Sequence, residues 1–130
     1  MSQDDVQRLR EGYEAFNAGD WERVIASFAP DFTSSDRPDL LDAERDVEPA
    51  RAMERAGAQF DDYRLDPLRF EDGEDWVLVT VRQSGRGKVS GVPVEEELFH
   101  LWDVRGGRAV QLRAFSTKEE ALAVTGWSAS

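Results

Sequence analysis

The chain has no cysteine and only one histidine, His100, among its 130 residues. The lack of cysteine excludes a thiolate nucleophile, a disulfide and a thiolate metal site. A single histidine also excludes a zinc or iron site built from several imidazoles of one chain. We therefore expect no metal site and no cofactor.

Long hydrophobic runs are also missing, and positive charge is scarce. No apolar stretch approaches the roughly 18 residues that a membrane-spanning helix needs. The first five residues are polar and acidic, unlike a signal peptide. The 16 Lys and Arg residues face 27 Asp and Glu residues, for a formal net charge of −11. Such a surface repels phosphate backbones and anionic membranes, so we expect a cytoplasmic protein whose partners include neither nucleic acid nor a membrane.

The N-terminal part of the chain predicts two helices joined by a tight turn. Gly19 would end the first helix and Asp20 would cap the second, which Pro30 would end. A glycine inside the first helix, Gly12, predicts close packing against a neighbour. In both segments the apolar residues recur at helical spacing: Val6, Leu9, Tyr13 and Phe16, then Trp21, Val24, Ile25 and Phe28.

The remainder predicts mostly strands, over residues 32–36, 63–70, 76–83, 94–104 and 109–116. Pro67 suggests that the second of these lies at a sheet edge, and residues 84–91 form a flexible glycine-rich connection. A helix opens near Pro49, and a last short helix begins at Thr117, which forms a capping box with Glu120. Helices first, then a mostly antiparallel sheet, then a short helix make an α+β domain.

Two segments carry a family resemblance, Tyr13-Glu-Ala-Phe-Asn-Ala-Gly-Asp-Trp21 and the stretch from Phe99-His-Leu-Trp-Asp-Val-Arg to Leu122. They resemble the SnoaL-like branch of the nuclear transport factor 2-like superfamily, whose members include ketosteroid isomerases, polyketide cyclases, dehydratases and non-catalytic binding domains. The resemblance implies a single domain over residues 1–130, a cystatin-like roll in which a cone-shaped, curved sheet wraps around the N-terminal helices. It also implies an apolar cavity that binds a small apolar or aromatic molecule.

The turn at Gly106-Gly107 sets which residues face that cavity. A two-residue turn places His100 beside Arg113, whereas a turn with Gly107 as a bulge places His100 beside Leu112 and Trp102 beside Val110. Because the family usually has a bulge here, we expect the second register. One face then carries Leu98, His100, Trp102, Leu112 and Ala114, and the other carries Phe99, Leu101, Gln111, Arg113 and Phe115.

A sheet that is apolar on both faces must pack each face against other protein surface. We expect its own helices on the cavity face and a second copy of the chain on the other. The sequence therefore predicts a homodimer through the face with Phe99, Leu101, Arg113 and Phe115.

By the same resemblance, Asp36 falls where ketosteroid isomerases carry their carboxylate base, and His100 falls where they direct a proton donor at the substrate carbonyl. This pair would support cofactor-free proton abstraction next to a carbonyl, as in isomerisation, cyclisation or dehydration. Two positions depart from the family, since Ala114 and Gly12 stand where polar residues are usual. The ligand-binding candidates are Tyr13, Phe16, Phe32, Met53, Trp102, Leu112 and Ala114.

Plainer interpretations stay open beside these. Asp36 directly precedes Arg37-Pro38 and could simply organise a turn, and His100 could be a hydrogen-bonded core residue. Glu95 and Glu97 point to one side of a strand, but a solvated strand end explains them better than a metal site. The competing functions are an enzyme, a non-catalytic ligand-binding module and a subunit interaction domain.

Overall fold

The computed structural model describes residues 3–35, 58 and 60–125, and it has the predicted α+β architecture. Five strands form one sheet in the order β1-β5-β4-β3-β2, in which β1 runs parallel to β5 and all other neighbours are antiparallel. The helices are α1 (Gln3–Asn17), α2 (Trp21–Ala26) and α4 (Lys118–Ala123). The strands are β1 (Phe28–Ser35), β2 (Phe60–Asp72), β3 (Trp76–Gly87), β4 (Pro93–Arg105) and β5 (Arg108–Phe115).

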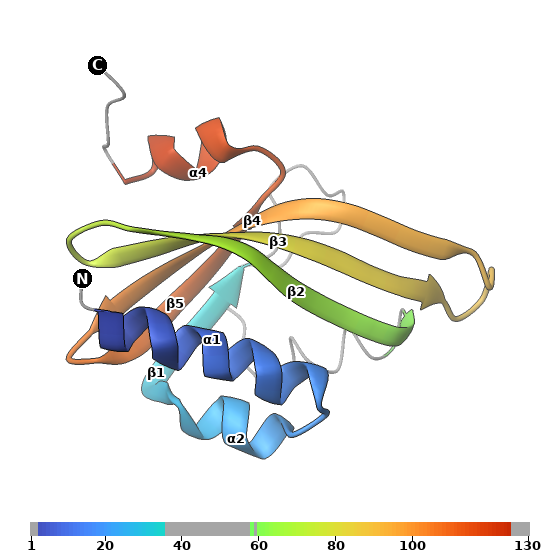
Figure 1. Cartoon of the computed structure of the whole chain (residues 1–130), viewed down its shortest axis with the longest axis horizontal. Helices are drawn as coiled ribbons and strands as arrows, with labels where there is room; N and C mark the ends of the chain where they lie inside the picture. The colour runs from blue at the N-terminus through green and yellow to red at the C-terminus, as the bar shows by residue number, and fades with distance from the viewer. Residues whose placement is uncertain (1–2, 36–57, 59, 126–130) are drawn as a thin grey trace.

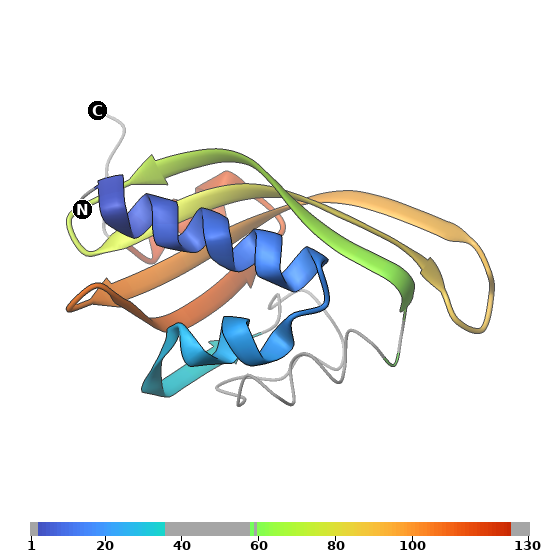
Figure 2. The same cartoon turned by 60° about the horizontal axis from the view of Figure 1, so that its bottom comes forward.

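The curved sheet has helices on both faces. Helices α1 and α2 lie together on one side of it, and α4 lies on the other (Figure 1). In the turned view the long strands bend over α1, and the β3–β4 hairpin extends well beyond the helices (Figure 2). We call the face toward α1 and α2 the inner face and the face toward α4 the outer face. The expected curved, mostly antiparallel sheet around N-terminal helices is confirmed.

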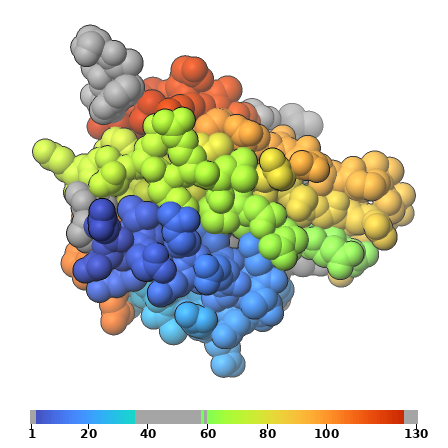
Figure 3. Space-filling model, in the orientation of Figure 1, coloured from blue at the N-terminus to red at the C-terminus, as the bar shows by residue number. Residues whose placement is uncertain are grey.

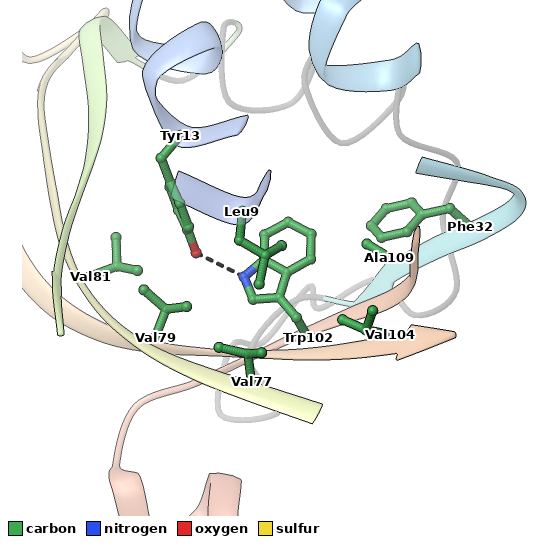
Figure 4. Packing of buried hydrophobic residues seen from close by; sticks show 9 residues of the cluster. All are labelled: Leu9, Tyr13, Phe32, Val77, Val79, Val81, Trp102, Val104 and Ala109. Carbon is green, nitrogen blue, oxygen red and sulfur yellow. Dashed lines mark hydrogen bonds between the residues drawn. The ribbon is translucent and has the colours of Figure 1, made fainter. Parts of the chain in front are cut away.

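The core follows the period of two along β3. Val77, Val79 and Val81 are fully buried on the inner face, while Leu78 is fully buried on the outer face. Burying each such side chain contributes about 1.5–3 kcal/mol. Residues of α1, β1, β4 and β5 complete the inner cluster: Leu9, Tyr13, Phe32, Trp102, Val104 and Ala109 (Figure 4).

Side-chain to backbone hydrogen bonds attach α1 to β2 and to the turn between β4 and β5. The Asn17 side chain donates to the Leu65 carbonyl and accepts from the Leu65 N–H, both at 2.9 Å. At the other end of the helix, Arg8 donates to the Gly107 carbonyl at 2.8 Å. Helix α1 and strand β2 consequently lie side by side across the front of the molecule (Figure 3). Gly19, with φ 78°, ends the tight turn before the Asp20 cap of α2, as predicted.

Helix α2 is shorter than predicted, because it ends at Ala26 and not at Pro30. Ser27 closes it by donating its hydroxyl to the Val24 carbonyl at 2.6 Å. Phe28 already belongs to β1 and lies opposite Ala109 of β5. Conversely, β3 continues to Gly87 through the stretch predicted to be a flexible connection. A Cβ on Gly85 would lie 3.3 Å from the Asp61 carbonyl oxygen, so glycine lets β2 approach closely there.

Both predicted registers of the β4–β5 hairpin are wrong. The turn has two residues, Gly106 and Gly107, with φ of 57° and 77°. Between Asp103 and Val104 the pairing then shifts by one residue, and this shift is opposite in direction to the expected one. His100 therefore lies opposite Ala114, and Trp102 lies opposite Leu112. Since the observed and expected registers differ by two residues, the side chains keep the faces that the sequence predicts.

Helix α4 covers part of the outer face, which the sequence analysis assigned to a second chain. Thr117 caps it as predicted, accepting from the Glu120 N–H at 3.2 Å. Ala121 of α4 packs with Leu101 and Phe115, which are already buried within one chain. Phe99 and Arg113 are half-buried on the same face.

Candidate functional site

A cavity of about 1010 Å³ opens between the inner face of the sheet and helices α1 and α2. This volume suits a small organic molecule. The described ligand-binding candidates all lie in its wall, and His100 lies there with them: Tyr13, Phe16, Phe32, Trp102, Leu112 and Ala114. The other two site candidates, Asp36 and Met53, lie outside the described residues.

Aromatic rings form one part of this wall. The Phe28 and Phe32 rings stack with their centroids 3.9 Å apart. Both rings tilt against Trp102, at 5.9 and 6.1 Å. The helical spacing predicted Phe28 to lie in the second helix. Because α2 ends before Phe28, this residue belongs to β1 instead and reaches the cavity. Such a wall favours a flat apolar or aromatic ligand.

A chain of hydrogen bonds joins three aromatic side chains at the cavity. The Trp102 Nε1–H donates to the Tyr13 phenol oxygen at 2.9 Å (Figure 4). That oxygen lies 2.8 Å from Nδ1 of His100. Two-residue alternation on β4 puts residues 100 and 102 on the inner face. Tyr13 meets them from the buried side of α1, where Leu9 is also buried.

The donors and acceptors of this group favour one of the two neutral tautomers of His100. Trp102 can only donate, so the Tyr13 oxygen accepts from it. The phenol has one hydrogen, and Nδ1 of His100 is its acceptor among the described residues. A neutral imidazole that accepts at Nδ1 carries its hydrogen on Nε2. We therefore infer the tautomer of His100 that carries an Nε2–H donor.

Burial keeps both titratable members of this group uncharged. Desolvation lowers the pKa of His100 from 6.5 to about 4. Desolvation also raises the pKa of the Tyr13 phenol well above its ordinary value, although the Trp102 hydrogen bond opposes this shift. At neutral pH His100 is therefore a neutral hydrogen-bond donor at the cavity, not a cation.

A second polar group lines the same cavity nearer the β3–β4 hairpin, and the sequence analysis missed it. The Tyr63 hydroxyl donates to Gln83 Oε1 at 2.5 Å, and Gln83 Nε2 donates to Glu96 Oε1 at 3.2 Å. Gln83 and Glu96 are direct neighbours across β3 and β4. The available signal was the period of two, since residue 96 shares a face with His100.

Gly12 also lies in the cavity wall, and the close packing expected for it is wrong. A Cβ built at this position meets no atom within 4 Å. The glycine therefore leaves room in the cavity, where a larger residue of α1 would take up space.

The described ranges contain no group of three histidine, cysteine, aspartate or glutamate side chains that could hold a metal ion. In the same part of the chain, no helix is both long enough and apolar enough to cross a membrane.

The family model of the SnoaL-like domain matches residues 9–112. The chain belongs to the SnoaL-like family. The match spans most of α1, all of α2, strands β1 to β4, and β5 up to Leu112. The family resemblance given by the sequence is therefore confirmed. Among curated proteins, no sequence matches the chain.

Solved structures give this SnoaL-like domain the same fold. A nuclear transport factor 2-like protein of unknown function from Burkholderia pseudomallei is 26% identical, with a TM-score of 0.74 over 95% of this chain and 97% of that one. A proposed polyketide cyclase from Xanthomonas campestris pv. campestris is 20% identical, with a TM-score of 0.74 over 93% and 96%. TerC, co-crystallised with polyporic acid, is 15% identical, with a TM-score of 0.73 over 96% and 100%. At these identities the last two likenesses concern the fold alone.

Proposed function

We propose that the cavity binds a small, largely apolar or aromatic molecule through a carbonyl or phenolic oxygen that accepts a hydrogen bond from Nε2–H of His100. The observation that carries this proposal is the Trp102–Tyr13–His100 chain, at 2.9 and 2.8 Å, in the wall of a cavity of about 1010 Å³. A neutral donor suits an apolar site, because no charge has to be desolvated when the ligand enters. TerC, which has this fold and was co-crystallised with polyporic acid, supports an aromatic ligand.

The reaction that such a donor favours is cofactor-free proton transfer next to a carbonyl. A base removes the proton from the carbon beside the carbonyl, and the electron pair of that bond moves onto the oxygen as an enolate. A hydrogen bond from Nε2–H stabilises the new charge on oxygen, and the base then returns the proton to carbon or oxygen. The resemblance assigns the role of base to Asp36.

The alternative is a ligand-binding module without turnover. The described acidic residues favour this alternative. Three of them line the cavity, Asp5, Glu11 and Glu96, and none of the three hydrogen-bonds His100. Binding would then use the same donor and the same aromatic wall, and Asp36 would organise the turn before Pro38.

The test uses 4-acetylbiphenyl, an apolar aromatic ketone with exchangeable hydrogens beside its carbonyl. We expect it to raise the melting temperature of wild type through selective binding to the folded state. His100→Phe keeps a ring of similar shape but no donor, so it should lose most of this shift while retaining a folded circular dichroism spectrum. No shift with wild type, or an equal shift with His100→Phe, would contradict the proposal.

Deuterium exchange separates the enzyme from the binding module. In D₂O an enzyme would exchange the acetyl hydrogens of 4-acetylbiphenyl, as followed by proton NMR, and Asp36→Asn would stop the exchange while leaving binding intact. Binding without exchange in wild type would favour the module.

We also propose that the chain forms a homodimer through the outer face. Because α4 already buries Leu101 and Phe115, the exposed part of such an interface would centre on Phe99 and Arg113. Sedimentation velocity on wild type and Phe99→Glu tests this: a dimer that becomes a monomer in the variant supports it, and a monomeric wild type refutes it.

A further inference from the structure

Two of the polar groups that line the cavity lie on one strand at a fixed separation. His100 and Glu96 are four residues apart on β4, and both line the cavity. Each residue of an extended strand advances the chain by about 3.3 Å, so the two positions are about 13 Å apart along it. The same spacing separates their partners on β3, since Val79 lies opposite His100 and Gln83 lies opposite Glu96. The sheet itself therefore sets the distance between the two polar ends.

The two ends have opposite hydrogen-bonding character. His100 offers a donor, because its Nδ1 already accepts from Tyr13. Glu96 offers a carboxylate, an acceptor with about four lone-pair positions on its two oxygens. One oxygen accepts from Gln83, whose own carbonyl accepts from Tyr63. This pairing holds Gln83 and the carboxylate in a set orientation at the cavity wall.

Among the described residues, apolar side chains line the wall between the two ends. Leu98 lies midway on β4 and is 4% exposed, and it lines the cavity together with Leu65 of β2. The rings of Phe16 and Tyr63, which also line the cavity, meet edge to face at 5.9 Å. Leu98, Leu65 and Phe16 offer no hydrogen-bond partner to a polar group in the middle of a ligand, which disfavours such a group.

We propose that the natural ligand is an elongated, rigid molecule with an oxygen acceptor at one end, an apolar middle and a hydroxyl donor at the other end. The acceptor bonds to His100 and the hydroxyl bonds to Glu96. After the side chains and hydrogen bonds at each end are allowed for, the two oxygens of the ligand lie on the order of 10 Å apart, the length of two linked aromatic rings. This inference rests on the proposed function, whose binding site it extends from one end to two.

Three ketones that differ by one feature at a time test the two-ended site. They are 4-acetylbiphenyl, 4-acetyl-4′-hydroxybiphenyl, which adds the far hydroxyl, and 4-hydroxyacetophenone, which has the hydroxyl but only one ring. Isothermal titration calorimetry on wild type should show that the hydroxybiphenyl ketone binds at least tenfold more tightly than 4-acetylbiphenyl. The single-ring ketone should bind most weakly, because it cannot reach both ends.

Glu96→Gln and Glu95→Gln form a matched pair of variants for this test. Both remove one negative charge from adjacent residues of β4, but Glu95 lies on the outer face, 3.3 Å from Arg82. We expect Glu96→Gln to reduce the tenfold gap between the two biphenyl ketones to threefold or less, and Glu95→Gln to preserve it. Glu95→Gln should bind 4-acetylbiphenyl as wild type does.

The outcomes separate this inference from the proposed function. Equal binding of the two biphenyl ketones by wild type, with loss of both in His100→Phe, would overturn the two-ended site and leave the proposed function standing. A gap that persists in Glu96→Gln would also overturn it. If neither biphenyl ketone binds wild type, both proposals fall.

Discussion

The Tyr13 phenol oxygen lies 2.8 Å from Nδ1 of His100, which joins helix α1 to strand β4 inside the cavity. The same oxygen accepts from Trp102. With Nδ1 as the acceptor of the phenol hydrogen, the neutral imidazole carries its own hydrogen on Nε2. Tyr13 is therefore a positioning residue for His100. Tyr13 also lies in the cavity wall, where it stays a predicted ligand contact.

Tyr13→Phe should destabilise the fold. The change removes one hydroxyl and leaves the buried Trp102 N–H and His100 Nδ1 without their partner, which costs about 1–3 kcal/mol in unfolding free energy. Urea denaturation followed by circular dichroism measures it. Tyr63→Phe is the control, since that hydroxyl is part of a half-buried pair with Gln83. An equal or greater loss in the control would contradict the buried chain of hydrogen bonds.

His100 should make stability fall as the solution becomes acidic. Its pKa is about 4 in the folded chain, against 6.5 without burial. Between these values the unfolded chain takes up a proton that the folded chain does not, so the loss begins near pH 6.5 and is complete near pH 4. The full difference is on the order of 3 kcal/mol. Glutamine cannot titrate, so the denaturation midpoint of His100→Gln should fall less than that of wild type between pH 6.5 and pH 4. Parallel curves for the two proteins would refute it.

Asn17→Ala should weaken the attachment of α1 to β2. The substitution leaves the Leu65 N–H and carbonyl without their side-chain partner, with an expected loss of about 1–3 kcal/mol. Glu14→Ala, on an exposed position of the same helix, should change stability by less than about 0.5 kcal/mol. Thermal denaturation of both variants gives the comparison, and a neutral Asn17→Ala would show that the two hydrogen bonds do not hold the helix.

Gly12 offers a test of the open cavity. Gly12→Ala should stabilise the fold by up to about 1 kcal/mol, because alanine favours helix and its Cβ meets no atom within 4 Å. Gly12→Leu should keep the fold and bind 4-acetylbiphenyl more weakly, since its side chain enters the cavity. If the alanine variant were clearly destabilised, the space beside Gly12 would not be open.

Local periodicity was enough to predict the elements that form the fold. The helical spacing of Leu9 and Tyr13 and the alternation of Val77 and Val79 each identify the buried side of their element. The side chains of β4 and β5 also lie on the predicted faces, because a shift by two residues leaves the period of two unchanged.

The hairpin register could not be predicted, because long-range pairing decides it. Gly106-Gly107 permits either of the expected turns, whereas the shift next to Ala109 accompanies the pairing of β5 with β1 on its other side. The β1 ladder is itself irregular between Phe28 and Thr33, where Pro30 lacks an N–H. The residues around the turn carry no information about the pairing of β5 with β1, so the register could not be predicted from them.

The site was predicted only in part for a similar reason. His100 stood out as the single histidine, but its partner Tyr13 is 87 residues away in sequence. The Asn17 contact with Leu65 spans 48 residues and has no local signal. Glu96 is different, since alternation on β4 alone would have placed it on the cavity face with His100.

The most direct test of the account is nitrogen NMR of the imidazole across a pH titration. Because His100 is the only histidine, its two ring nitrogens give the only imidazole signals of the ¹⁵N-labelled protein. The account predicts an Nε2–H tautomer at pH 7 and a pKa of about 4. A titration near pH 6.5, or a proton on Nδ1 at pH 7, would contradict the claim that His100 is a neutral donor at the cavity.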